Sequence, residues 1–269
     1  MRIVHIDCGR EMGGGQWQVL RLLRGLRGYG CESILMSRGR LGELAAEEGF
    51  PVEKVSWCIP AADLVHAHDA RGHTVAALFA RTPVIVARRV AFPVKQGWLS
   101  RWKYRRASHF IGVSQFVARM LMDAGVPAEK ISIVHDGVPL LPLSLRDGPV
   151  LELAKNTSHL EQDLLHARLL VYLSDAEGLG SGALLGMSAG VPVIASRVGG
   201  LPEVIEDGVN GILTSNDPAE VARSVARLEA DREEAARLGA NARLTIEERF
   251  TVERMVDDTM AVYRRILHA

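Results

Sequence analysis

Short runs of β-branched and other apolar residues alternate along the chain with longer stretches in which apolar residues recur every three to four positions. The first pattern is typical of buried strands and the second of amphipathic helices, so their alternation predicts βα units on parallel sheets. The first half contains about seven such strands, at 2–7, 32–37, 52–55, 64–67, 84–87, 110–113 and 131–134. The helices expected among them are 16–27, 41–48, 72–80, 99–107 and 115–124.

The second half repeats the alternation. Its predicted strands are 150–154, 169–173, 191–195 and 211–214, with helices at 160–167, 182–189 and 202–205 and two or three more from Pro218 onward. Asp217 and Thr251 are expected to cap helices in this tail. Two prolines and the polar stretch 144–148 indicate an interdomain linker, which predicts domains at 1–143 and 144–269.

The composition narrows the classes of protein. Of 269 residues, 48% are hydrophobic and 24% charged, which suits one large or two small domains with cores. Basic and acidic residues both number 32, so a basic surface covering the whole protein, as for nucleic acid, is not expected. Three scattered cysteines and the absence of a signal-like or spanning apolar run predict a cytoplasmic protein, with peripheral contact at the inner face of the membrane.

A glycine loop follows the first predicted strand. Gly13, Gly14 and Gly15 lead into a helix, an arrangement in which backbone amides can approach a phosphate. A plain turn between strand and helix is the alternative. The loop lacks the GxGxxG spacing and the acidic partner of a dinucleotide site, which argues against a nicotinamide-dependent oxidoreductase.

Polar side chains end two neighbouring strands of the first half. His66 and His68 share one face of a strand, a spacing that can bind a metal, but the sequence offers no third ligand and we expect none bound. His66 equally suits a structural role. Arg88 and Arg89 close the next strand and suit a diphosphate or an acidic acceptor, or alternatively form a surface pair that bridges to the second domain.

The segment 95–106 (KQGWLSRWKYRR) interleaves basic residues with Trp98, Trp102 and Tyr104. This composition is typical of a helix that lies on anionic lipid. It also suits an exposed helix whose aromatic side chains pack inward.

The strongest functional pattern lies at 174–200. A strand turns through Glu177 into a helix that starts near Gly180 and Ser181, where free amides can face a phosphate and Glu177 can bind sugar hydroxyls. The next strand ends in Gly199 and Gly200, a second loop and helix start at the same sheet edge. Two adjacent loops of this kind predict a nucleotide pocket.

These residues resemble the group-one, or family-four, retaining glycosyltransferases of the GT-B fold. The matching segments are 177–180 (EGLG), 187–196 (MSAGVPVIAS), 199–203 (GGLPE) and 207–211 (DGVNG), with weaker agreement at 13–16, 66–69, 113–114 and 136–138. The resemblance implies an α/β protein with two Rossmann-like domains, the second one reduced.

The resemblance also implies an activity. It is transfer of a sugar, with retention, from a nucleoside-diphosphate sugar to a glycan or lipid acceptor, as in the synthesis of cell-envelope polysaccharides, without a metal or other cofactor. The implied catalytic residues are Glu177, His68 and Arg89, and the implied donor-binding residues are Gly14, Gly15, Gly180, Ser181, Gly199, Gly200 and Glu203.

Three departures from the family pattern keep another interpretation open. Leu185 stands where the family has a second glutamate, and Arg89 where it has a histidine. The stretch from Asp136 to Glu177 is too short for the βα units that normally lie there. A catalytically weak or inactive homologue, which binds a nucleotide sugar or a protein partner, is therefore the alternative, ahead of an epimerase or another Rossmann-like enzyme.

Overall fold

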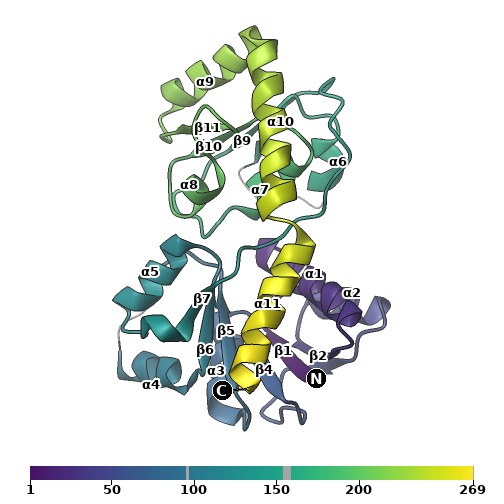
Figure 1. Cartoon of the computed structure of the whole chain (residues 1–269), viewed down its shortest axis with the longest axis vertical. Helices are drawn as coiled ribbons and strands as arrows, with labels where there is room; N and C mark the ends of the chain where they lie inside the picture. Colours follow the sequence, from purple (N-terminus) through teal and green to yellow (C-terminus); the bar gives the residue numbers. More distant parts are fainter. Residues whose placement is uncertain (95–96, 154–158, 269) are drawn as a thin grey trace. The chain divides into compact units, whose positions relative to one another are not determined.

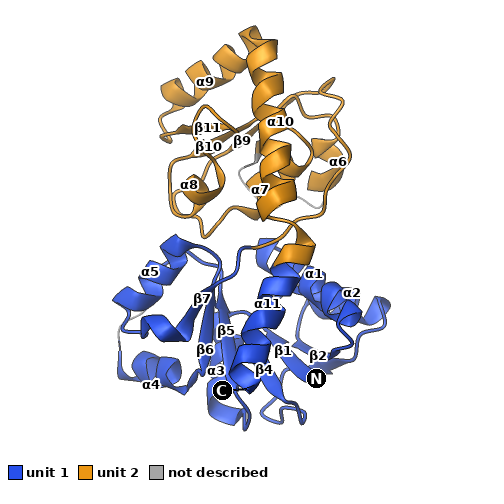
Figure 2. Ribbon diagram, in the orientation of Figure 1, with its two compact units in different colours: residues 1–135, 255–269 blue, residues 136–254 orange. Residues whose placement is uncertain are grey.

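The protein was analysed as a computed structural model, which describes residues 1–94, 97–153 and 159–268. The chain forms two compact units (Figure 2): unit 1 contains Met1–His135 and Met255–Ala269, and unit 2 contains Asp136–Arg254. Each unit holds a parallel sheet with helices packed on it (Figure 1). The α/β class predicted from the alternating patterns is confirmed.

The sheet of unit 1 has seven parallel strands in the order β3-β2-β1-β4-β5-β6-β7. Their bounds are β1 (Arg2–Asp7), β2 (Glu32–Ser37), β3 (Val52–Lys54), β4 (Leu64–Ala67), β5 (Val84–Arg88), β6 (His109–Gly112) and β7 (Ile131–Ile133). The strand order reverses between β1 and β4. In open α/β sheets, ligands bind outside the carboxyl ends of the strands at such a reversal.

Six α-helices of the described chain belong largely or wholly to unit 1: α1 (Gly14–Gly28), α2 (Arg40–Glu47), α3 (Ala70–Phe79), α4 (Trp98–Arg106), α5 (Gln115–Asp123) and α11 (Val252–Leu267). Side-chain caps start two of them, because Asp69 accepts from the amide of Gly72 and Ser114 from that of Val117. Such caps satisfy amides that have no partner inside the helix.

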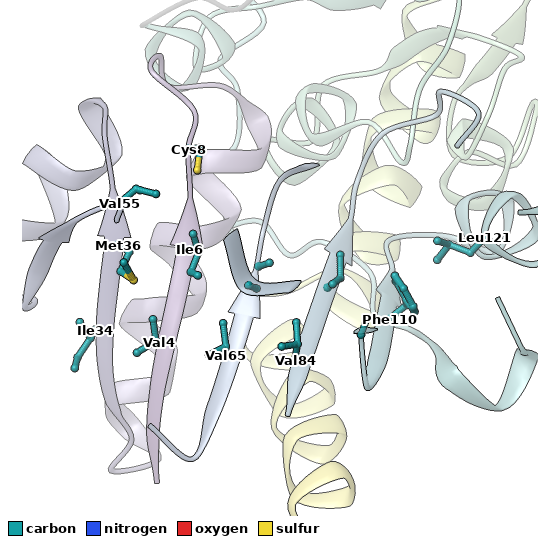
Figure 3. Close-up of a cluster of buried hydrophobic side chains, with 14 of the residues drawn as sticks. Val4, Ile6, Cys8, Ile34, Met36, Val55, Val65, Val84, Phe110 and Leu121 are labelled. Carbon is teal, nitrogen blue, oxygen red and sulfur yellow. The ribbon is translucent and has the colours of Figure 1, made fainter. Parts of the chain in front are cut away.

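The core of unit 1 lies on both faces of its sheet. Alternate residues of the central strands, such as Val4, Ile6 and Val65, form one apolar cluster together with Phe110 (Figure 3). The opposite face packs against α1 and α2 in a second cluster that includes Leu35 of β2. This alternation is the expected result of a strand buried on both faces.

The last helix, α11, completes unit 1. A Cβ at Gly25 of α1 would lie 2.3 Å from Val256 Cγ2, so α1 and α11 approach closely because Gly25 has no side chain. Tyr263 of α11 is fully buried and bonds to His66 of β4. The contacts therefore divide the chain differently from the predicted domains 1–143 and 144–269, since the buried face of α11 packs within unit 1.

Unit 2 has a smaller sheet, with four strands among the described residues in the order β11-β10-β9-β8. Its strands are β8 (Val150–Leu153), β9 (Leu169–Tyr172), β10 (Val193–Ser196) and β11 (Ile212–Thr214). Its helices are α6 (Leu160–Leu164), α7 (Ser181–Ser188), α8 (Leu201–Val204), α9 (Pro218–Ala230) and α10 (Arg232–Arg249). The last residue of the predicted strand 150–154 lies outside the described residues.

Helices cover both faces of this smaller sheet. Leu228 of α9 and Leu238 of α10 pack on Leu169, Val171 and Ile194. On the other face α7 comes close to β9, where a Cβ at Gly186 would lie 2.4 Å from Leu170 Cδ2. The short spacing predicted a reduced second domain. Its sheet has four described strands, against seven in unit 1, and still carries helices on both faces. Among the helices that the structure describes, none is both long and apolar enough to cross a bilayer.

Candidate functional site

A cavity of about 310 Å³ opens at the carboxyl ends of β4 and β5; we refer to it as the unit 1 pocket. Its lining comes from the start of α1, the β4–α3 junction, the end of β5 and α4. Of the predicted site residues of the first half, Gly15, His68 and Arg89 all line it. Gly14 is the first residue of α1 and is not among the described lining residues.

The glycine loop at the start of α1 is held by its own side-chain contacts. The Gly13 amide donates to Gln16 Oε1 (3.2 Å), and Gln16 Nε2 donates to Asp7 Oδ2 (3.2 Å) at the end of β1. A Cβ at Gly15 would lie 4.0 Å from Arg89 Cδ. The loop therefore places the start of α1 within van der Waals reach of Arg89, as expected at a strand-order reversal.

His68 is buried and engaged on both ring nitrogens. Its Nε2 lies 3.0 Å from His5 Nδ1, and its Nδ1 lies 3.4 Å from Arg89 Nη1. Burial, with the nearby His66, His5 and Arg89, holds the pKa of His68 well below its usual value, so the ring is neutral. Since arginine only donates, His68 Nδ1 accepts and His68 Nε2 carries the proton that reaches His5. The catalytic role of His68 stays a prediction.

His66 joins β4 to α11, because its Nδ1 lies 2.5 Å from the hydroxyl of Tyr263. His5 pairs with His66 in the β1–β4 register, so three imidazoles gather, with one ligand nitrogen of each within 4.8 Å of the others. Strand pairing brings His5 beside His66 and His68 as a third imidazole. The expectation that no third ligand accompanies these two histidines is therefore wrong. Burial, the neighbouring imidazoles and the charge of Arg89 lower the pKa of both His66 and His68, and the Arg89 charge opposes a cation there.

Arg88 and Lys103 also line the unit 1 pocket. Arg88 Nη1 donates to Tyr104 Oη (3.1 Å), and Lys103 Nζ donates to Ala70 O (3.1 Å). Burial, together with the charge of Arg88, lowers the pKa of Lys103, and the Asp69 carboxylate partly offsets this effect. The arginine pair that the sequence left open between a surface bridge and a ligand site thus lies at a pocket.

The basic aromatic segment 95–106 divides its aromatic side chains. Tyr104 stacks on Phe110, with ring centroids 5.3 Å apart, so it packs inward as one alternative predicted. Trp98 and Leu99 are 73% and 60% exposed. Membrane contact through this helix stays a prediction. Lys95 lies outside the described residues.

Two loops of unit 2 interlock at the carboxyl ends of β9 and β10. Gly199 has φ 58°, and a Cβ there would lie 1.9 Å from Glu177 O. The Gly200 amide donates to that same oxygen (3.0 Å). Gly180, at φ 104°, is the N-cap of α7 and gives it no side-chain cap, and Ser181 is the first residue of the helix. The structure thus brings together Glu177, Gly180, Ser181, Gly199 and Gly200, five of the predicted residues.

The Glu177 carboxylate is fixed by two donors. Tyr172 Oη donates to Glu177 Oε2 (2.7 Å), and the Gly178 amide donates to Glu177 Oε1 (3.0 Å). Burial and the Glu177 charge raise the pKa of Tyr172, so its hydroxyl stays protonated and able to donate. Tyr172 was not predicted from the sequence to belong to the site. The only sequence feature that could have indicated it is its position at the end of the strand that leads into the Glu177 loop.

Glu203 follows this cluster directly, in the first turn of α8, where its amide donates to Gly200 O (3.0 Å). It lines another cavity, of about 570 Å³, with Asn241 and Arg249 of α10, and the described lining does not include Glu177 or Gly180. Leu185, at the position of the family's second glutamate, is 8% exposed and belongs to the core of unit 2. Of the predicted donor-binding residues, Gly14 and Gly15 belong to unit 1 and the others to unit 2. Their role in donor binding stays a prediction.

Comparison with protein families gives two matches. The model of the glycosyl transferases group 1 matches residues 150–245, and that of glycosyltransferase family 4 matches residues 12–140. Together they cover most of the chain and fall on its two halves in order.

Relatives of known name align with parts of the chain. N-acetyl-α-D-glucosaminyl L-malate synthase of Bacillus anthracis is 34% identical over 143 residues, which are 46% of this chain and 37% of the relative. D-inositol 3-phosphate glycosyltransferase of Thermobifida fusca is 36% identical over 103 residues, which are 38% of this chain and 24% of the relative. The chain thus spans less than half of the length of these relatives.

Solved structures share the fold over nearly the whole chain. Anabaena HepE in complex with UDP-glucose superposes with a TM-score of 0.85 at 18% identity, over 98% of this chain and 100% of HepE. Sucrose-phosphate synthase of Thermosynechococcus elongatus gives 0.76 at 15% identity, over 99% of each chain. The two family models place the chain among the group 1 glycosyltransferases, and the solved structures show the fold that it shares with them.

Proposed function

We propose that the protein transfers a glycosyl group from a nucleoside-diphosphate sugar to an acceptor, with retention at the anomeric carbon. The observation that carries the proposal is the pair of interlocked glycine loops around Glu177 in unit 2. The motifs of these loops resemble those of a family of retaining transferases, which supports the proposal. HepE, which shares the fold, was solved with UDP-glucose.

In this proposal the donor diphosphate lies at the start of α7. The N-terminal amides of a helix and its macrodipole favour an anion, and Gly180 leaves them uncovered by any cap side chain. Glu177, oriented by Tyr172 and by the Gly178 amide, binds hydroxyls of the transferred sugar. Fixed dipoles of this kind stabilise the charge that develops on the leaving diphosphate without reorganising.

The acceptor lies in unit 1 in this proposal, where Gly15, His68 and Arg89 line the pocket. The two relatives described above are named for L-malate and for D-inositol 3-phosphate, two different compounds. A glycan or lipid of the cell envelope is the acceptor class that we propose from the family resemblance. The exposed Trp98 and Trp102 of α4 favour peripheral contact with a membrane.

A catalytically weak or inactive homologue is the second candidate. Leu185 in the core of unit 2 and the four described strands of its sheet favour this alternative. Losing one preorganised contact to developing charge costs about 2.7–4 kcal/mol of transition-state stabilisation in other enzymes. Such a protein would bind a nucleotide sugar and turn it over slowly or not at all.

A thermal-shift screen against UDP, GDP, ADP and their common sugar conjugates tests donor binding. A ligand at 100 times its Kd adds about 2.7 kcal/mol to the free energy of unfolding, which raises the Tm measurably. We expect one nucleotide to shift the Tm. Transfer or hydrolysis of the matching sugar nucleotide then separates the active enzyme from the inactive homologue.

The matched variants are Glu177→Gln and Tyr172→Phe. We expect E177Q to abolish transfer, and Y172F to slow it by roughly tenfold, because one neutral-to-charged hydrogen bond contributes about 1.5–3 kcal/mol. Tyr29→Phe, which removes the hydroxyl that donates to Asp257 in unit 1, is the control. A cooperatively melting protein that responds to none of the nucleotides would contradict the proposed function.

A further inference from the structure

The unit 1 pocket carries more positive than negative charge. Its described lining includes three cations, Arg88, Arg89 and Lys103, and one carboxylate, Asp69. Its two histidines add no charge, because burial lowers the pKa of His68 well below its usual value and that of His73 to about 3. Arg88 and Lys103 alone outnumber this carboxylate, so at neutral pH the described lining holds an excess of positive charge.

The hydrogen bonds of Arg88 and Lys103 do not neutralise this excess. Arg88 donates to the Tyr104 hydroxyl and to Phe92 O, and Lys103 donates to Ala70 O and Thr74 Oγ1. All four acceptors are neutral. In addition, Arg88 Nε is buried with no hydrogen-bond partner among the described residues.

Asp69, the one carboxylate of the described lining, caps a helix. Asp69 Oδ1 accepts from the Gly72 amide (2.6 Å) as the N-cap of α3. Burial raises the pKa of Asp69, and the Gly72 hydrogen bond opposes that rise. Asp69 is thus placed to hold a helix start, and Arg88 and Lys103 keep capacity for an external anion.

The shape of the unit 1 pocket and the start of α1 beside it also favour an anion. Tyr104 and Phe110 form a stacked apolar wall of the pocket. The first turn of α1, which lines the pocket through Gly15 and Gln16, contains no acidic residue. A volume of about 310 Å³ is at the lower end for small-molecule sites, enough for an anionic group attached to one small ring or hydroxy acid.

We propose that the unit 1 pocket binds a phosphate or carboxylate group of the acceptor, and that Arg88 and Lys103 select acceptors that carry such a group. This inference rests on the proposed function and specifies the acceptor class for it. Arg88 presents a planar donor set that matches phosphate and carboxylate oxygens, and Lys103 supplies a point charge. The acceptor hydroxyl then belongs to the same molecule as the anion, either a phosphorylated or carboxylated sugar or the headgroup of an anionic lipid.

Titration of the full-length protein with inorganic phosphate, followed by calorimetry, tests the pocket directly. We expect Arg88→Gln and Lys103→Gln each to weaken phosphate binding about tenfold or more, because each removes a charge-assisted hydrogen bond. The matched controls are Arg119→Gln, on an exposed part of α5, and Lys54→Gln, on the edge strand β3. Lys103→Arg keeps the charge and is expected to keep most of the affinity.

Two arms identify the source of the anion. In one arm, glucose 6-phosphate and glucose are compared as acceptors, and in the other, vesicles of phosphatidylinositol in phosphatidylcholine are compared with phosphatidylcholine alone. Faster transfer to the anionic member of either pair, reduced in R88Q and K103Q but not in the controls, supports the proposal. Equal phosphate affinity in the wild type, R88Q and K103Q overturns it.

The nucleotide screen keeps this outcome separate from that of the proposed function. R88Q and K103Q are expected to show the wild-type Tm shift with the donor nucleotide, since Glu177 and its loops are in unit 2. Phosphate binding without any nucleotide response would contradict the transferase and leave the anion pocket standing. A nucleotide response without phosphate binding would support the transferase and contradict the anion pocket.

Discussion

Gly199 and Gly208 have the same kind of backbone conformation in different surroundings. Both lie in the left-handed region, at φ 58° and 75°. A Cβ at Gly199 would lie 1.9 Å from Glu177 O, whereas a Cβ at Gly208 would meet nothing within 4 Å. The left-handed conformation costs an L residue roughly 1–2 kcal/mol at either position. Only Gly199 adds a collision with the loop that holds Glu177.

We therefore expect Gly199→Ala to lower the free energy of unfolding by more than Gly208→Ala does, and to abolish the Tm shift caused by the donor nucleotide. G208A should lose about 1 kcal/mol and keep that shift. Urea unfolding and thermal shift on the two variants measure both effects. Equal stability and equal nucleotide response in the two variants would show that the loops are not locked at Gly199.

At the residue scale, the sequence predicted the site wherever a polar or glycine residue follows a strand. Gly15, His68 and Arg89 come from three separate segments and line one pocket, because parallel strands end at a common edge. His5 and Tyr172 were missed. Their roles depend on which strand pairs with which and on side-chain direction, and neither is contained in a local pattern.

At the element scale, the strands follow the predicted pattern closely. β4 has the predicted bounds, 64–67. β10 begins at Val193 and not at 191, after Pro192, which has no amide to donate to a sheet. α11 was predicted as a helix but assigned to the second domain, because an amphipathic face does not specify its partner. Its packing against Gly25 and His66 arises only in the folded protein.

α4 allows a test of membrane contact at the same scale. Trp98 and Trp102 are 73% and 40% exposed beside the basic residues of the helix. We expect the double substitution W98S/W102S to reduce sedimentation with anionic vesicles by several-fold, because aromatic side chains anchor helices at lipid interfaces. Trp57→Ser, at a tryptophan that is 79% exposed elsewhere in unit 1, is the control. Equal sedimentation of both variants and the wild type would argue against peripheral contact through α4.

At the scale of the whole molecule, buried neutral histidines make stability depend on pH. Burial lowers the pKa of His5 and His73 to about 3, and burial with the charge of Arg265 lowers that of His109 to about 4. Burial also holds the pKa of His66 and that of His68 well below the usual value. In the unfolded chain these groups titrate near 6.5. Below about pH 6.5 the unfolded chain therefore binds protons that the folded protein cannot.

We expect the free energy of unfolding to be highest above pH 6.5 and to fall as the pH is lowered toward 4. Each such histidine contributes up to about 1.4 kcal/mol per pH unit. Burial raises the pKa of Asp7 and Asp69, and this effect acts in the opposite direction near pH 4. Urea unfolding at several pH values measures the slope. His5→Gln should make it shallower than His166→Gln, a change at an exposed histidine, and a flat profile would contradict the assignment.

The placement of α11 has a consequence for biosynthesis. Unit 2 is one continuous segment, 136–254, whereas unit 1 is built from residues on both sides of it. A ribosome delivers all of unit 2 before it delivers Tyr263, the partner of His66. Domains generally fold as units while the chain emerges. The first unit to begin synthesis is therefore the last to be finished, and a nascent chain exposes the α11-binding surface of unit 1 until translation has passed the second unit.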